Sequence, residues 1–251
     1  MERWVGKIAM VTGASSGIGA AITKELVREG MVVLGVARRV EKVKELESSL
    51  KGAKGKLHAV KGDVGDEADV SRVFEWVRST FGKIHVLINN AGVNRNIPLT
   101  GGANMADMRA LFQTNVFGLL YCTDAAVTLM KDSGVDDGHI FHMNSIAGHQ
   151  VVPMPGNYVY TASKFAVTAL TEGLRRELRD AHMKTRVTCI SPGFVKTDIA
   201  AAGHMDEVAK LMDTMPALDP SEIASAVTYA LSAPPSVQVH DVVIKPLGEM
   251  I

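Results

Sequence analysis

A glycine-rich turn between a short apolar run and a helical stretch is the feature that most constrains this fold. Residues Ile8–Val11 are apolar, Thr12–Gly19 contains three glycines, and helical periodicity follows over Ala20–Arg28. Glycine lets the backbone turn tightly and approach a ligand, while amides at a helix start point at bound phosphate. The spacing is G-x-x-x-G-x-G, not the G-x-G-x-x-G of the standard dinucleotide fingerprint. The segment predicts a strand, a phosphate-binding turn and a helix; the alternative is a tight turn that binds nothing.

The same alternation of strand and helix continues along the chain. Further strands are predicted over residues 31–36, 56–61, 84–89, 140–144, 186–190 and 239–244. Long helices are predicted over Met105–Lys131 and Asn157–His182, and another over Ser221–Leu231 with Ser221 as its N-cap. Strands that alternate with helices form a doubly wound parallel sheet. We predict one α/β domain of the Rossmann type over residues 1–251, with about seven strands and helices on both faces of the sheet.

Composition excludes several classes of function. Lys+Arg and Asp+Glu each number 27, so no global charge attracts nucleic acid or an anionic membrane. No apolar run reaches the roughly 18 residues of a membrane span. Cys122 and Cys189 lie in apolar runs, which favours free thiols and a cytoplasmic location. Neither cysteine has a partner at metal-ligand spacing, and His139, His142 and His149 are interpreted as surface or crevice residues, so no metal site is predicted.

The end of the second predicted strand indicates which dinucleotide binds. A Rossmann unit that binds NAD carries an acid near this point, whereas an arginine accommodates the 2′-phosphate of NADP. Here Arg38 and Arg39 follow Ala37, and the acid is missing. Because guanidinium groups match the geometry of phosphate, the predicted cofactor is NADP(H). The alternative is the solvated start of a helix over Val40–Leu50, although a cation there opposes the helix dipole.

Several polar or small residues stand where predicted strands end. Ligands of a doubly wound sheet bind at the carboxyl ends of its strands. Asp63, Asn90, Gly92 and Ser145 occupy such positions, but Asp63 could instead cap the next helix and the others could be turn residues. Asn115 lies inside a predicted helix, where asparagine is a weak helix former, and its simplest interpretation is a satisfied, partly buried amide.

One helical pair can carry proton transfer. Tyr160 and Lys164 are four residues apart and therefore share a helix face. The ammonium should lower the pKa of the phenol, which could then exchange a proton with a substrate oxygen. Tyr158 lacks such a partner, because the residue four positions on is Ala162. Taken alone, the pair is better interpreted as a half-buried aromatic ring and a solvated lysine.

Together these motifs resemble the short-chain dehydrogenase/reductase family. The resemblance rests on T-G-x-x-x-G-I-G at Thr12–Gly19, Asp63-Val64, N-N-A-G at Asn89–Gly92, Asn115, Ser145, Y-x-A-S-K at Tyr160–Lys164 and P-G-x-x-x-T at Pro192–Thr197. Their order spans nearly the whole chain. The segments Val135–His139, Ser145–His149 and Thr168–Arg175 are similar to the subgroup that includes insect farnesol dehydrogenases and vertebrate dehydrogenase/reductase member 11. The resemblance implies NADP(H) chemistry on isoprenoid alcohols or on steroid and other lipophilic carbonyls.

The resemblance also implies a role for each site residue. Tyr160 would donate or accept the proton, Lys164 would lower its pKa and bind the nicotinamide ribose, and Ser145 would orient the substrate oxygen. Asn115 would hold a water in the proton relay. The implied cofactor-binding residues are Gly13, Ser15, Ser16, Gly17, Ile18, Gly19, Arg38, Arg39, Asp63, Val64, Asn90, Gly92, Tyr160, Lys164, Gly193, Val195 and Thr197.

The resulting hypothesis is an NADP(H)-dependent oxidoreductase that moves hydride between nicotinamide and a lipophilic alcohol or carbonyl. By family resemblance it should form a homo-oligomer, either a dimer or a tetramer. Residues 199–218, which include Met205, Met212 and Met215, are interpreted as a substrate lid; the alternative is a surface helix packed on the core. The rival function is a non-catalytic dinucleotide-binding protein, which would have no reason to keep Asn115, Ser145, Tyr160 and Lys164 together.

Overall fold

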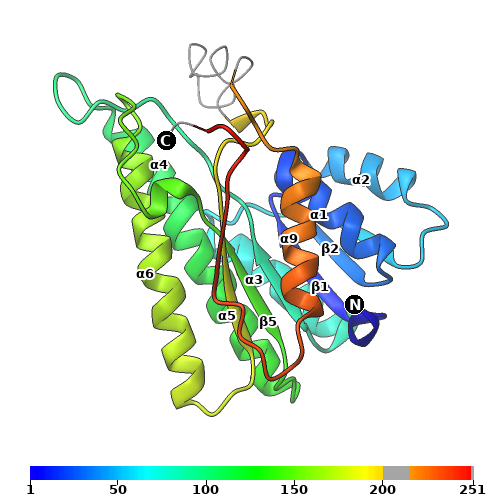
Figure 1. The fold of residues 1–251 in the computed structure, drawn as a ribbon. Coiled ribbons are helices and arrows are strands. Elements are labelled where there is room, and N and C mark those ends of the chain that lie inside the picture. Colours follow the sequence, from blue (N-terminus) through cyan, green and yellow to red (C-terminus); the bar gives the residue numbers. More distant parts are fainter. Residues whose placement is uncertain (200–214, 250–251) are drawn as a thin grey trace.

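The computed structural model describes residues 1–199 and 215–249 (Figure 1). Within these ranges, seven strands form one sheet in the order β3-β2-β1-β4-β5-β6-β7, and every neighbouring pair is parallel. The order reverses between β1 and β4, as in a doubly wound sheet. The predicted Rossmann-type fold is confirmed. The strands are β1 Ile8–Thr12, β2 Val32–Ala37, β3 Lys56–Lys61, β4 Val86–Asn89, β5 His139–Met143, β6 Arg186–Pro192 and β7 Asp241–Ile244.

Helices cover both faces of the sheet (Figure 1). The helices α1, α2 and α9 pack on one face, and α3, α5 and α6 pack on the other. In the described parts of the chain, no helix combines the length and the apolar character that crossing a bilayer requires. The helices are α1 Gly17–Arg28, α2 Val40–Ser49, α3 Glu67–Phe81, α4 Met105–Phe112, α5 Gly118–Asp132, α6 Tyr158–Asp180 and α9 Pro220–Ser232, with short turns η1 Glu2–Trp4, η2 Gln113–Phe117 and η3 Ile146–Gly148.

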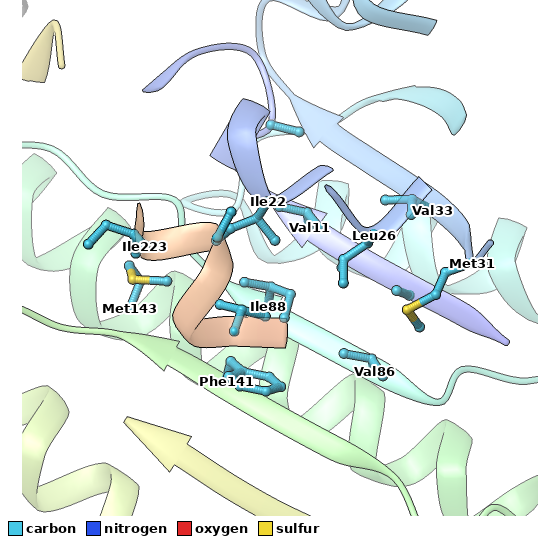
Figure 2. Close-up of a cluster of buried hydrophobic side chains, with 14 of the residues drawn as sticks. Val11, Ile22, Leu26, Met31, Val33, Val86, Ile88, Phe141, Met143 and Ile223 are labelled. Atoms are coloured by element: carbon cyan, nitrogen blue, oxygen red, sulfur yellow. The ribbon is translucent and has the colours of Figure 1, made fainter. Parts of the chain in front are cut away.

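Alternating side chains of the central strands fill a separate core on each face. Val11 and Phe141 pack against Ile22 of α1 and Ile223 of α9 (Figure 2). Their strand neighbours, Met10 and Ile140 among them, point to the opposite core beneath α3 and α5. Because both faces are covered, all five residues of β1 are buried, which explains its apolar run Ile8–Val11. Because the helices cover the two faces of the sheet, the carboxyl ends of its strands remain uncovered.

Two predicted helix features are wrong. The helix predicted over Met105–Lys131 is divided by η2, a π-helical segment that holds Asn115. The N-cap of α9 is Asp219 rather than Ser221, and it forms a reciprocal capping box with Glu222. Pro220 occupies the first helical position, which suits proline because no partner is needed for its missing N–H.

The predicted lid over 199–218 falls largely outside the described residues. Of that segment, the structure describes Ile199 and residues 215–218. Leu218 is buried and pairs with the loop after β6, because its N–H donates to Phe194 O at 2.8 Å and its O accepts from Lys196 N at 2.9 Å. The chain that leads into α9 therefore lies beside residues 194–196.

Candidate active site

A cleft of about 340 Å³ opens at the carboxyl ends of the strands. The loops after β1, β2, β3, β4, β5 and β6 all contribute to it, together with the first turn of α6. This is the edge at which doubly wound sheets bind ligands. The structure brings every predicted site residue except Asn115 to the cleft wall: Gly13, Ser15, Ser16, Gly17, Ile18, Gly19, Arg38, Arg39, Asp63, Val64, Asn90, Gly92, Ser145, Tyr160, Lys164, Gly193, Val195 and Thr197.

Contacts with the loop after β4 shape the glycine turn, Thr12–Gly19. Gly13 has φ +69°, and a β-carbon on it would lie 2.9 Å from both Ala91 Cα and Asn90 Nδ2. Asn90 Nδ2 donates to Thr12 O at 2.9 Å, while Thr12 Oγ1 accepts from the main-chain N–H groups of Asn90 and Ala91, both at 3.0 Å. Gly13 is therefore required by the left-handed backbone and by the close approach of the neighbouring loop. Asn90 holds the turn in place.

The two arginines turn toward this end of the cleft. Arg39 Nη2 donates to Ser16 Oγ at 3.1 Å, which lays the guanidinium over the glycine turn. Arg38 Nη1 lies 3.8 Å from Asp63 Oδ2, and its side chain is 64% exposed. The capping alternative for Asp63 is wrong, because Asp66 caps α3 and accepts from two amides of its first turn. Arg38, Arg39 and Asp63 therefore form a hydrophilic rim around one end of the cleft.

The predicted proton-transfer residues meet at the other end. Ser145 follows β5 and hydrogen-bonds the Tyr160 side chain. Lys164 is only 7% exposed, its Nζ donates to Met143 O at 2.8 Å, and Nζ lies 5.7 Å from the centroid of the Tyr160 ring. A lysine ammonium carries three donors, so two remain for another partner. The sheet and α6 thus hold a phenol, a hydroxyl and a buried amine in one corner of the cleft.

Burial determines how these groups ionise. Removal from water raises the pKa of Tyr160 to about 12, and the hydrogen bond with Ser145 lowers it in part. The same cause lowers the pKa of Lys164 to about 8. Burial therefore outweighs any lowering of the phenol pKa by Lys164, because removal from water disfavours the charged form of both groups. That Lys164 lowers the pKa of Tyr160 stays a prediction. With this raised pKa Tyr160 keeps its proton at neutral pH, which makes it a candidate proton donor.

Asn115 lies behind the cleft wall and ties three elements together. Its Oδ1 accepts from Val93 N at 2.8 Å, and its Nδ2 donates to Val93 O at 2.9 Å and to Ser163 Oγ at 3.2 Å. Ser163 Oγ in turn donates to Tyr160 O at 2.7 Å. The interpretation as a satisfied buried amide is confirmed, and π-helical segments such as η2 often mark functional sites. A role for Asn115 in holding a water stays a prediction.

Sequence reasoning missed the residues at the substrate end of the cleft. These come from the loops after β4, before α6 and after β6, and no local pattern marks them: Asn94, Arg95, Val152, Met154, Asn157 and Phe194. Ile199, the first residue of the predicted lid, also lines the cleft. For Asn157 alone, the sequence held a signal: it lies three residues before Tyr160, almost one helical turn away, which places it near that side chain. Its contact with the loop after β4 could not be inferred from that spacing.

A chain of hydrogen bonds fixes the orientation of the Asn157 amide. Asn94 Oδ1 accepts from Arg95 N at 2.8 Å, so Asn94 Nδ2 must face the other way, toward Asn157 Oδ1 at 2.9 Å. The Asn157 Nδ2 group therefore points away from Asn94, and within the described part of the chain it has no hydrogen-bond partner. Asn157 offers a free donor on the same wall as Tyr160.

Several known proteins are similar to this chain over nearly its whole length. The farnesol dehydrogenase of Aedes aegypti is 49% identical over 250 residues, covering 99% of each chain. Human dehydrogenase/reductase SDR family member 11 is 42% identical over 255 residues, covering 100% of this chain and 98% of the relative. A short-chain dehydrogenase/reductase from Burkholderia phymatum, solved in complex with NAD, is 26% identical with a TM-score of 0.87, covering 97% of this chain and 90% of its own.

The family model described as short chain dehydrogenase matches residues 7–207, a span that runs from β1 past the loop after β6. The match therefore includes every segment that lines the cleft wall. Because the family model covers most of the chain and these relatives match it over nearly its whole length, the protein belongs to the short-chain dehydrogenase/reductase family of oxidoreductases.

Proposed function

We propose that this protein is an NADP(H)-dependent oxidoreductase that transfers hydride between nicotinamide and a lipophilic alcohol or carbonyl compound. One observation carries the proposal: a half-buried, protonated Tyr160 hydrogen-bonded to Ser145 lies at one end of a cleft whose other end is rimmed by Arg38 and Arg39. In one cleft, the rim can hold a phosphate of a dinucleotide cofactor, and the proton donor can serve the reaction at the other end of that cofactor.

The residues of the cleft fit a nicotinamide dinucleotide. The glycine turn gives close backbone access, and the amides at the start of α1 suit the pyrophosphate. Arg38 and Arg39 would hold the 2′-phosphate, and the two remaining donors of Lys164 would hold ribose hydroxyls. A bound nicotinamide supplies or accepts the hydride. The relative from Burkholderia phymatum was solved with NAD, so the preference for NADP rests on these two arginines.

Proton transfer follows from the ionisation of the site. In the reducing direction, Tyr160 gives its hydroxyl proton to the carbonyl oxygen as negative charge develops there, and the Ser145 hydroxyl orients that oxygen. A positioned general acid contributes about 10²–10⁴-fold to the rate. The nearby ammonium of the buried Lys164 stabilises the phenolate that remains.

Apolar side chains in the cleft support a lipophilic substrate. Val152, Met154, Phe194 and Ile199 line the cleft, and methionine adapts to irregular apolar shapes. The relative from Aedes aegypti carries the name farnesol dehydrogenase. The proposed lid over 199–218 would enclose such a substrate and exclude water.

A substrate panel tests this function. Purified protein is assayed with NADPH or NADP against farnesol, farnesal, steroid ketones, small quinones and short alcohols or aldehydes. We expect a much higher kcat/KM for the long apolar compounds. Equal kcat/KM for short polar compounds would overturn the lipophilic assignment, and NADPH binding without turnover on any compound would favour a non-catalytic dinucleotide-binding protein.

Location and assembly complete the proposal. Cys122 and Cys189 are buried free thiols, which supports a cytoplasmic location. Phe117, Leu120 and Phe165 are exposed on η2, α5 and α6, and exposed apolar side chains on these neighbouring helices support a homo-oligomer. Light scattering after size exclusion should report a dimer or tetramer for the native chain and a smaller species for Phe165→Glu.

A further inference from the structure

Three potential metal ligands from distant parts of the sequence meet beside α6. His149 follows η3, Cys189 lies in β6 and Asp241 begins β7. Their ligand atoms all lie within 4.8 Å of one another. Cys189 and Asp241 are register partners on parallel strands, so their side chains share one face of the sheet. The prediction that Cys189 has no partner at ligand spacing holds along the sequence but not in space.

A fourth oxygen atom lies among these three groups. Ser191 Oγ is 2.8 Å from His149 Nε2, 3.5 Å from Cys189 Sγ and 3.4 Å from Asp241 Oδ1. His149 Nε2 is also 3.7 Å from Asp241 Oδ2. Zinc bonds of about 2.0–2.3 Å in a tetrahedron imply ligand-to-ligand distances of roughly 3.3–3.8 Å. Three of the four measured distances fall in this range, and the fourth requires a small movement of the Ser191 hydroxyl.

We propose that His149, Cys189 and Asp241 bind a zinc-like divalent cation, with Ser191 Oγ or a water as the fourth ligand. Nitrogen, sulfur and oxygen donors of this kind are the set that Zn²⁺ prefers. The Cys189 thiolate and the Asp241 carboxylate together balance the two positive charges. On binding, the thiol gives its proton to solvent, so the affinity should rise with pH.

The surroundings make this a clamp next to the cleft and not a catalytic centre. The four residues lie outside the cleft wall, but Ser191 runs directly into Pro192 and Gly193, which line it. An ion would join the loop after β5 to β6 and β7 through direct bonds. Cys189 lies close enough to Lys164 that a negative charge on the Cys189 sulfur favours the ammonium form of Lys164. Burial also raises the pKa of the Cys189 thiol, so an ion must compete with a proton there.

Spectroscopic titration tests the site directly. The full chain, freed of metal by a chelator and kept reduced, is titrated with Co²⁺. We expect a thiolate-to-cobalt charge-transfer band and the visible absorption of tetrahedral cobalt, both removed by stoichiometric Zn²⁺. Bound Zn²⁺ should also raise the melting temperature, because the ligand binds only the folded state. A native chain without the thiolate band overturns the proposal.

Matched variants identify the ligands. Cys189→Ser should abolish the thiolate band and weaken Zn²⁺ at least tenfold, and Asp241→Asn should keep the band but weaken Zn²⁺ by a similar factor. Cys122→Ser is the control, since Cys122 is the other buried thiol and belongs to no such cluster among the described residues. Loss of the band in Cys122→Ser, or native Zn²⁺ affinity in Cys189→Ser, contradicts the site. Should Cys189→Ser fail to fold, His149→Gln decides, because His149 lies in a loop and is exposed; native affinity there overturns the proposal.

Discussion

The two ends of the cleft handle charge in opposite ways. At one end the side chain of Arg38 is 64% exposed and Arg39 lies at the same rim, so water screens both guanidinium groups. At the other end Lys164 is 7% exposed and burial shifts its pKa and that of Tyr160. Water screens an exposed charge from its neighbours, whereas the ionisation of a buried group depends strongly on them. The rim is therefore suited to holding a charged ligand, and the buried corner to moving a proton.

The largest expected effect comes from removing the proposed proton donor. Tyr160→Phe should lower turnover by about 10²–10⁴-fold and leave NADPH affinity nearly unchanged, because only the reacting proton is lost. Steady-state assays and fluorescence titration with NADPH measure the two quantities. Tyr158→Phe is the matched control, since this neighbouring phenol has Ala162 where Tyr160 has Lys164. Near-normal turnover in Tyr160→Phe would remove the phenol from the mechanism.

The exposed rim should control the choice of cofactor. Replacing Arg38 and Arg39 together by Ala should weaken NADPH by about 1.5–3 kcal/mol, because a charge-assisted contact with the 2′-phosphate is lost, and should leave NADH almost unaffected. Binding titrations with both cofactors measure this difference. Arg28→Ala removes an equally exposed arginine at the end of α1 and should change neither affinity. Equal weakening of NADPH and NADH would mean that the rim arginines are only structural.

The buried lysine should make stability depend on pH. Its folded pKa of about 8 lies below the ordinary 10.5, so between these values the unfolded state binds more protons and stability rises with pH. From pH 7.5 to 9.5, the free energy of unfolding of the native chain should rise by about 2 kcal/mol relative to Lys164→Met. Urea denaturation at both pH values measures it. Lys24→Met, which replaces an exposed lysine, is the control. If the free energy of unfolding of the native chain does not rise relative to that of Lys164→Met, burial is not the dominant influence on the pKa of Lys164.

The smallest effect concerns the free amide donor at the substrate end. Asn157→Ala should lower kcat/KM by about 1 kcal/mol, roughly fivefold, for ketones that carry a second acceptor oxygen. Farnesal has a single oxygen, which Ser145 and Tyr160 engage, so its kcat/KM should hardly change. Comparison of a steroid diketone with farnesal on the same variant is the measurement. An equal loss on both substrates would mean that Asn157 only supports the loop at Asn94.

The sequence predicted those parts of the site that lie within one short stretch, but not those that bring distant segments together. The glycine turn, the two arginines and the Tyr160–Lys164 pair each lie within a short stretch, where spacing alone reports a turn, a strand end or a helix face. Asn94 and Asn157 are 63 residues apart, and their contact depends on how the loops after β4 and before α6 pack together. The cluster of His149, Cys189 and Asp241 likewise depends on the pairing of β6 with β7.

By itself, the sequence determined the parallel doubly wound sheet and the edge at which its functional residues gather. Alternating apolar strands and amphipathic helices leave few other ways to bury the apolar faces, and parallel strands bring their carboxyl ends to one side. Only the tertiary structure decided the protonation of Tyr160 and Lys164, the direction of the Asn157 amide and the neighbours of Cys189. The pKa of a group depends on how much water the surrounding chain removes from it, and here that chain comes from segments far away in the sequence.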